Sequence, residues 1–159
     1  MKTQNALRCL TGLWILVSLA LIGCAQFQHK LPEALPFMDR SQTKTDGEVR
    51  ETVAVPSTEE SEQIFGFPLA AKNIQPVWLE VENNSDTGFF LYHIAMDPDT
   101  YSSGEVAWKF QFSLYTKDSQ KNIYNLFRDN EIDWFFKPGT TTAGFVYTNL
   151  KMGTKAVLV

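Results

Sequence analysis

The feature that most constrains the fold is a short stretch of alternating residues in the middle of the chain. Residues 77–82 read Val-Trp-Leu-Glu-Val-Glu, so aliphatic residues occupy every second position. A period of two is typical of a β-strand that buries one face. The polar run at 83–86, Asn-Asn-Ser-Asp, then predicts a turn. The chain must therefore build a sheet around this strand.

Other segments supply further strands to this sheet. Residues 89–96 are rich in aromatic and aliphatic side chains. We expect them to pair with residues 77–82 as an antiparallel hairpin at the centre of the sheet. Strand-like composition also marks residues 49–55, 141–150 and 156–159.

Short helices are predicted between the strands. Residues 57–60 match a capping box, and the helix that they open is expected to end at Gly66. Residues 118–132 carry apolar side chains at helical spacing. Residues 103–115 fit two templates, because a second capping box favours a helix whereas strict alternation favours a strand. We expect a helix there that gives way to a strand.

These patterns predict a single, mainly β domain over residues 48–159. We expect an immunoglobulin-like β-sandwich with two or three short helices. The alternative is a small α+β fold with helices on one face of a sheet. The sequence has two cysteines, Cys9 and Cys24, and neither lies in this domain. We therefore expect no disulfide and no cysteine-ligated metal, so that the apolar core must hold the fold.

The N-terminal residues have the layout of an export signal. Lys2 and Arg8 make the first residues basic, and residues 9–22 form an almost uncharged apolar run. That run is shorter than the ~20 residues of a spanning helix, as in a secretory signal peptide. It ends in Leu21-Ile22-Gly23-Cys24, which resembles the lipobox of bacterial lipoproteins. In the alternative interpretation the segment stays uncleaved as an anchor, and its cysteine is incidental.

The lipobox resemblance implies where the protein is located and how it is attached to a membrane. It implies that residues 1–23 are a lipoprotein signal peptide and that Cys24 carries lipid such as palmitate, which holds the protein on a membrane. Residues 24–47 contain prolines and a polar run, so we expect a flexible tether. Ala25 stands where an aspartate would resemble an inner-membrane retention signal. We therefore expect a lipid-anchored protein of the bacterial cell envelope, at the outer membrane and facing the periplasm.

The charge balance argues against one class of partner. Loss of Lys2 and Arg8 with the signal peptide leaves 12 of the 14 basic residues against 18 acidic ones, a net charge of −6. An acidic chain without a basic patch is poorly suited to nucleic acid. We expect a membrane contact through the lipid on Cys24 and no nucleic-acid partner.

Few residues are placed for catalysis. His29 falls in the predicted tether, so His93 is the only histidine of the predicted domain. Nucleophilic triads and zinc sites need more ligands or bases than this, and phosphate-binding glycine loops are missing. We therefore expect no enzyme and no cofactor. The alternative is a small carboxylate- or calcium-dependent hydrolase or accessory factor that uses Asp97, Asp99 and Glu105.

Aromatic residues indicate where a partner would bind. Strand alternation puts Trp78 on the face opposite Val77 and Leu79. Either helices cover this second face, or Trp78 and Tyr92 belong to an exposed aromatic patch. Tryptophan and tyrosine are favoured anchors in interfaces. The candidate binding residues are therefore Trp78 and Tyr92, with an envelope protein as the expected partner.

Two stretches resemble a known family. Residues 74–86 resemble the start of the C-terminal domain of LssY-type bacterial membrane proteins. Pro138-Gly139-Thr140, followed by residues 144–150, is similar to a later segment of that domain. The resemblance covers roughly residues 48–159 and implies a shared fold without any catalytic residue. We expect a non-enzymatic binding or structural module.

Overall fold

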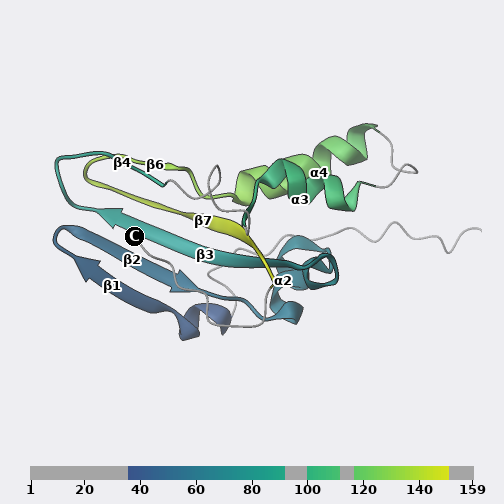
Figure 1. The fold of residues 1–159 in the computed structure, drawn as a ribbon, viewed down its shortest axis with the longest axis horizontal. Coiled ribbons are helices and arrows are strands. Elements are labelled where there is room, and N and C mark those ends of the chain that lie inside the picture. The colour runs from purple at the N-terminus through teal and green to yellow at the C-terminus, as the bar shows by residue number, and fades with distance from the viewer. Residues whose placement is uncertain (1–35, 92–99, 112–116, 151–159) are drawn as a thin grey trace, which may run out of the picture.

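The strand predicted at residues 77–82 lies at the centre of the structure. The computed structural model describes residues 36–91, 100–111 and 117–150, and Figure 1 shows them as a twisted sheet with helices at one end. The elements in chain order are η2 (Pro36–Arg40), β1 (Gln42–Asp46), β2 (Val49–Ala54), α2 (Thr58–Phe65), η3 (Leu69–Lys72), β3 (Ile74–Asn83), β4 (Phe89–Phe90), β5 (Thr100–Tyr101), α3 (Ser103–Phe110), α4 (Lys117–Asn130), β6 (Phe135–Phe136) and β7 (Thr140–Asn149). None of the helices in these ranges is long and apolar enough to span a membrane.

One five-stranded sheet is the frame of the domain. Its strands lie in the order β1-β2-β3-β7-β5, and every neighbouring pair is antiparallel. The longest pairing joins β3 to β7, from Ile74 opposite Asn149 to Asn83 opposite Thr140. Strands β4 and β6 form a separate antiparallel pair, which we call the β4–β6 ribbon. The prediction of a mainly β domain with a few helices is confirmed at this level.

The central hairpin predicted for residues 77–82 and 89–96 is wrong. Strand β3 pairs with β2 and β7, whereas β4 pairs with β6. The buried side chain of Asn83 accounts for the path, because its amide donates to the carbonyl oxygens of Thr87 at 2.8 Å and Phe136 at 3.2 Å. These bonds hold the chain that leaves β3 against the segment that enters β7. The remainder of the predicted second strand, 92–96, lies outside the described residues.

The predicted tether at 24–47 is also wrong from residue 36 onward. Phe37 in η2 is fully buried. Strand β1 pairs with β2 through a turn at Gly47, whose φ of 59° lies in the left-handed region that favours glycine. Because β1 is polar and exposed along its whole length, its composition is that of a linker. Residues 1–35 lie outside the described part of the chain.

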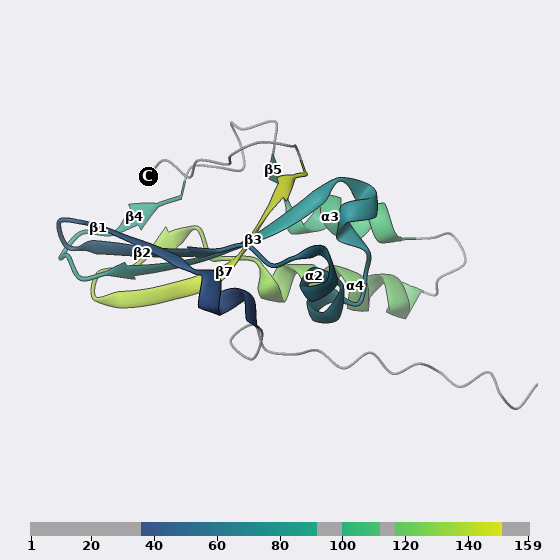
Figure 2. The same cartoon turned by 90° about the horizontal axis from the view of Figure 1, so that it is seen from below.

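The side chains on the two faces of β3 belong to two separate hydrophobic clusters. On one face, Trp78 packs in a cluster with buried residues of α2, α3 and α4. On the other face, Leu79 and Val81 pack with Phe136 of β6 and with Ile132, which lies between α4 and β6. Figure 2 shows the sheet nearly edge-on, with β4 above it and with α2 and α4 below.

The helix predictions agree with the structure where residues are described. Helix α2 has the capping box at 57–60 and ends at Gly66, which adopts a φ of 71°. Helix α4 matches the stretch predicted at 118–132. The ambiguous stretch at 103–115 is an α-helix from Ser103 to Phe110, and its residues 112–116 lie outside the description.

Candidate functional site

Helix α3 is fixed by hydrogen bonds at its first turn. The Ser102 hydroxyl accepts from the Glu105 N–H at 3.3 Å, and the Glu105 carboxylate accepts from the Ser102 N–H at 2.8 Å. Glu131, which follows α4, accepts from the N–H and the hydroxyl of Ser103 at 3.0 and 2.7 Å. These bonds occupy donors that a helix N-terminus would otherwise offer to an anion. The start of α3 is therefore an anchored end and not an anion site.

The inner face of α3 attaches the helix to the core. Val106, Ala107 and Phe110 are buried. The ring of Phe110 stacks on that of Phe127 in α4, with 5.9 Å between centroids. Helical spacing then places positions 105, 108 and 109 on the opposite, outward face.

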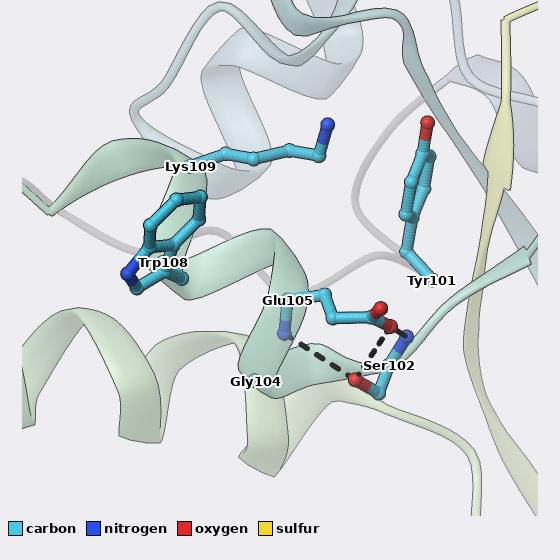
Figure 3. Close-up of a pocket in the computed structure, with 6 residues that line it drawn as sticks. All are labelled: Tyr101, Ser102, Gly104, Glu105, Trp108 and Lys109. Carbon is cyan, nitrogen blue, oxygen red and sulfur yellow. Dashed lines mark hydrogen bonds between the residues drawn. The ribbon is translucent and has the colours of Figure 1, made fainter.

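The outward residues of α3 line a recess that we call the α3 recess. Its volume is about 510 Å³, and its lining residues are Tyr101, Ser102, Gly104, Glu105, Trp108 and Lys109. In Figure 3, Tyr101 and Trp108 stand on opposite sides of the recess, and the side chain of Lys109 extends across one end. The Trp108 side chain is 73% exposed. The recess is thus an open cradle with two aromatic walls.

Two opposite charges lie between these walls. The Lys109 ammonium lies 4.7 Å from the centroid of the Tyr101 ring, within cation–π distance. Hydrogen bonds from the N–H and the hydroxyl of Ser102 hold the pKa of Glu105 below its ordinary value, and the charge of Lys109 contributes in the same direction. Glu105 is therefore a bound anion of the helix cap. Lys109 is the cation that the recess presents to a ligand.

The structure corrects the surface role predicted for Trp78. Its side chain is only 6% exposed, and its ring meets that of Phe145 edge-on at 5.1 Å. Helices cover this face, which is the first of the two alternatives that the sequence left open. Trp78 therefore belongs to the core. Tyr92 and Cys24 lie outside the described residues, and the roles predicted for them stay predictions.

Of the carboxylates named for the alternative function, only Glu105 lies among the described residues. Asp97 and Asp99 lie outside the description, as does His93, whereas Glu105 is bound in the cap of α3. Within residues 36–91, 100–111 and 117–150, no three histidine, cysteine or acidic side chains cluster in a way that would hold a metal ion.

Sequence reasoning missed Trp108 as a lining residue of the recess. The alternation of residues 108–114 suggested a strand, in which Trp108 would share a face with Phe110. The helical template separates them, because Trp108 lies outward while Phe110 lies inward. The signal that identifies the recess is therefore the spacing of Glu105, Trp108 and Lys109 at i, i+3 and i+4.

A second group of exposed aromatic side chains lies on the β4–β6 ribbon. Phe90 is 64% exposed and Trp134 is 65% exposed, and Phe89 is also exposed. The Phe90 ring contacts that of Phe135, with centroids 4.6 Å apart.

Comparison with known proteins identifies no relative for this chain. No protein-family model, no curated protein and no solved structure matches it at the significance required.

Proposed function

We propose that the chain is a lipid-anchored envelope lipoprotein that acts as a non-enzymatic binding module, with the α3 recess as its binding site. The observation that carries the proposal is the exposed Trp108, opposite Tyr101 and beside Lys109 in a hollow of about 510 Å³. Exposed tryptophan and tyrosine next to a hollow are the residues that most often dominate protein–protein binding. A side chain of an envelope protein that enters the recess would contact both rings.

The position of α3 relative to the start of the described chain supports this proposal. The chain enters the domain at η2 (dark blue). In Figure 1, η2 lies at the β1 edge of the sheet and α3 lies beyond the opposite edge, while buried residues of both pack in the cluster around Trp78. A tether that runs from η2 towards lipid on Cys24 would leave the α3 recess facing away from that membrane. The recess would then be accessible to a partner in the periplasm.

Two further parts of the proposal concern the fold and the cellular location. Helices on one face of the sheet favour the small α+β alternative over the immunoglobulin-like sandwich, while the β4–β6 ribbon on the other face retains a sandwich-like second layer. We also propose that the fold is shared with the C-terminal domain of LssY-type proteins. The outer membrane remains the proposed site of the anchor.

The anchor is tested by labelling. Radioactive palmitate should enter the wild-type protein and should not enter the Cys24→Ala variant, whose signal peptide should also stay attached. An alanine variant that is still cleaved and membrane-bound at the same size would contradict the lipoprotein assignment. Fractionation of the same cells separates the inner from the outer membrane.

The binding site is tested by cross-linking and pull-down of the lipidated protein from its own membrane. Trp108→Ala should reduce recovery of a specific partner at least tenfold. Trp134→Ala is the matched control, because Trp134 is exposed to a similar degree but lies on the ribbon. Both variants should keep the wild-type melting temperature within about 2 °C, since exposed side chains contribute little to stability. Equal recovery with Trp108→Ala would exclude the recess.

The same preparation tests the alternative enzyme function. Calcium-dependent turnover of envelope substrates that disappears in Asp97→Asn, together with no recovered partner, would replace the binding module by a hydrolase or accessory factor.

A further inference from the structure

Strand β1 gives the sheet an open edge. It pairs with β2 on one side, and within the described part of the chain no strand pairs with its other side. Figure 1 shows β1 as the outermost strand on one side of the sheet. All of its residues, Gln42–Asp46, are exposed. Such an edge is a template for another strand unless a proline, a bulge or a charge blocks it.

Two of these three kinds of protection are missing from β1. Its register with β2 is continuous from Gln42 opposite Val53 to Asp46 opposite Val49, so no bulge interrupts it. Its sequence, Gln-Thr-Lys-Thr-Asp, contains no proline. The remaining protection is the charge of Lys44, because like charges directly opposite each other are destabilising. That charge excludes only a pairing in which Lys44 meets another cation.

The turn after β1 determines which backbone groups point to the open edge. Two residues separate Asp46 from Val49, which form the last pair of the β1–β2 ladder. The pair next to a two-residue turn exchanges hydrogen bonds, and successive pairs then alternate between bonded and non-bonded. Thr43 and Thr45 are therefore in non-hydrogen-bonded pairs with β2. Their N–H and C=O groups are directed outward.

One antiparallel register of two β1 strands satisfies both the backbone and the charges. With Thr45 opposite Thr45 of a second copy, these two residues can exchange hydrogen bonds. The same register sets Lys44 opposite Asp46 of the second copy, and Asp46 opposite its Lys44, so two complementary pairs form. None of the salt bridges found among the described residues includes Lys44 or Asp46. A register centred on Lys44 would instead oppose the two lysines.

We propose that β1 of one copy pairs antiparallel with β1 of a second copy in the register centred on Thr45, so that two five-stranded sheets join edge to edge. The inference does not depend on the binding function of the α3 recess, because the two surfaces share no residue. Each copy contributes only a short strand, so the interface is small and the contact weak. A covalent trap is the suitable measurement of such a contact.

The test is a cysteine scan along β1 in the full-length protein, in its own membrane. Residues of a hydrogen-bonded antiparallel pair have Cα atoms ~5.5 Å apart, within the range of about 4.4–6.8 Å that a disulfide spans. Thr45→Cys should therefore link to itself across the interface. Thr43→Cys is the matched control, since it is an exposed threonine on the same face of the same strand. In the proposed register it is displaced from its copy by about 13 Å along the strands.

Mild oxidation should link Thr45→Cys chains into dimers at least fivefold more than Thr43→Cys chains. The parent protein without an added cysteine is the blank for Cys9 and Cys24. A yield that is largest for Lys44→Cys would overturn the proposed register. Equal yields at positions 43 and 45, or no dimer above the blank, would overturn the pairing itself.

A charge exchange gives an independent measurement in the Thr45→Cys protein. Lys44→Asp alone, or Asp46→Lys alone, should lower the dimer yield several-fold, because each sets like charges opposite each other at two places. The variant with both changes should recover a yield within about twofold of the starting protein, since its pairs are complementary again. All of these positions are exposed, so the circular dichroism spectrum should not change. A double variant that dimerises as poorly as the single variants would overturn the proposed register.

Discussion

The two faces of the sheet use the same kind of side chain in opposite ways. On the helix-covered face, Phe127 is fully buried and its ring lies within 6 Å of four others, those of Phe65, Phe67, Phe110 and Tyr147. On the ribbon face, the ring of Phe90 lies close to that of Phe135 and remains largely exposed. Aromatic content alone therefore does not distinguish core from surface. Whether an aromatic residue is buried depends on the element that covers its face of the sheet.

The difference between the faces also separates stability from recognition. Helices α2, α3 and α4 cover one face, and Phe65, Phe127 and Phe145 are fully buried there, so these rings contribute to folding. The ribbon and the outward side of α3 keep aromatic residues that the core does not need. Surfaces of this kind on a small domain are the usual sites of interaction.

The largest expected effect tests the helix-covered face. Phe127→Ala should lower the free energy of unfolding by about 3–5 kcal/mol, because it removes a fully buried ring from a packed cluster. Urea denaturation followed by circular dichroism measures the loss. A loss below about 1 kcal/mol would mean that the helices do not cover this face as described.

The next effect tests the place where the chain after α4 crosses β7. A Cβ added at Gly144 would lie 2.6 Å from the backbone N and Cα of Ile132. Gly144→Ala should therefore cost about 1–3 kcal/mol, because backbone must shift. Gly104→Ala is the control, since its nearest neighbour would be 3.7 Å away in the ring of Tyr124 and alanine favours helix α3. Equal stability of the two variants would contradict the close approach of these segments.

A smaller effect with a pH signature concerns Tyr147. Its hydroxyl donates to the Phe127 carbonyl at 2.8 Å, so Tyr147→Phe should cost about 1 kcal/mol near neutral pH. Burial raises the pKa of Tyr147 well above its ordinary value, and the charge of Glu131 adds to this. The unfolded tyrosine loses its proton near pH 10 while the folded one keeps it, so this group makes wild-type stability fall as the pH rises above about 10.

Tyr147→Phe should therefore show a flatter loss of stability above pH 10 than the wild type does. Thermal melts between pH 8 and pH 11 compare the two proteins. Parallel curves would show that Tyr147 is not shielded from water in solution.

The smallest effect belongs to the ribbon. Phe90→Ala should cost only about 0.5–1 kcal/mol, the contribution of one exposed ring contact with Phe135. The same urea titration used for Phe127→Ala measures it, and the contrast between the two phenylalanines is the sharpest test of the two faces. A cost as large as that of Phe127→Ala would place Phe90 in a core that the described residues do not show.

The sequence pattern was sufficient for elements with local signals. The strand around residues 77–82, the capping box of α2 and the helical spacing of α4 depend on neighbours in sequence, and the structure has all three. Pairing between strands was not predictable in this way. The partner of β3 is β7, some 60 residues later, and alternation in a strand carries no information about which edge it meets.

The candidate site also could not be predicted from the sequence pattern. Alternation in a strand does not show what packs on its second face, so the sequence left open whether helices cover Trp78. Two periods overlap at residues 103–115, so the outward position of Trp108 was not predicted. Polar composition likewise concealed β1, an exposed edge strand whose residues resemble a linker. Each error arose where tertiary cover, and not local preference, determined the outcome.

The pairing of β3 with β7 has a consequence for the order in which the domain can assemble. The chain is synthesised from its N-terminus, so β1, β2 and β3 can associate before α3, α4 and β7 have been made. Until then β3, a strand of ten residues whose side chains are mostly buried in the folded domain, has one open edge, which can join another chain. Nascent or truncated forms that lack residues 140–149 should therefore aggregate, and a holding chaperone would be needed for as long as that edge is unpaired.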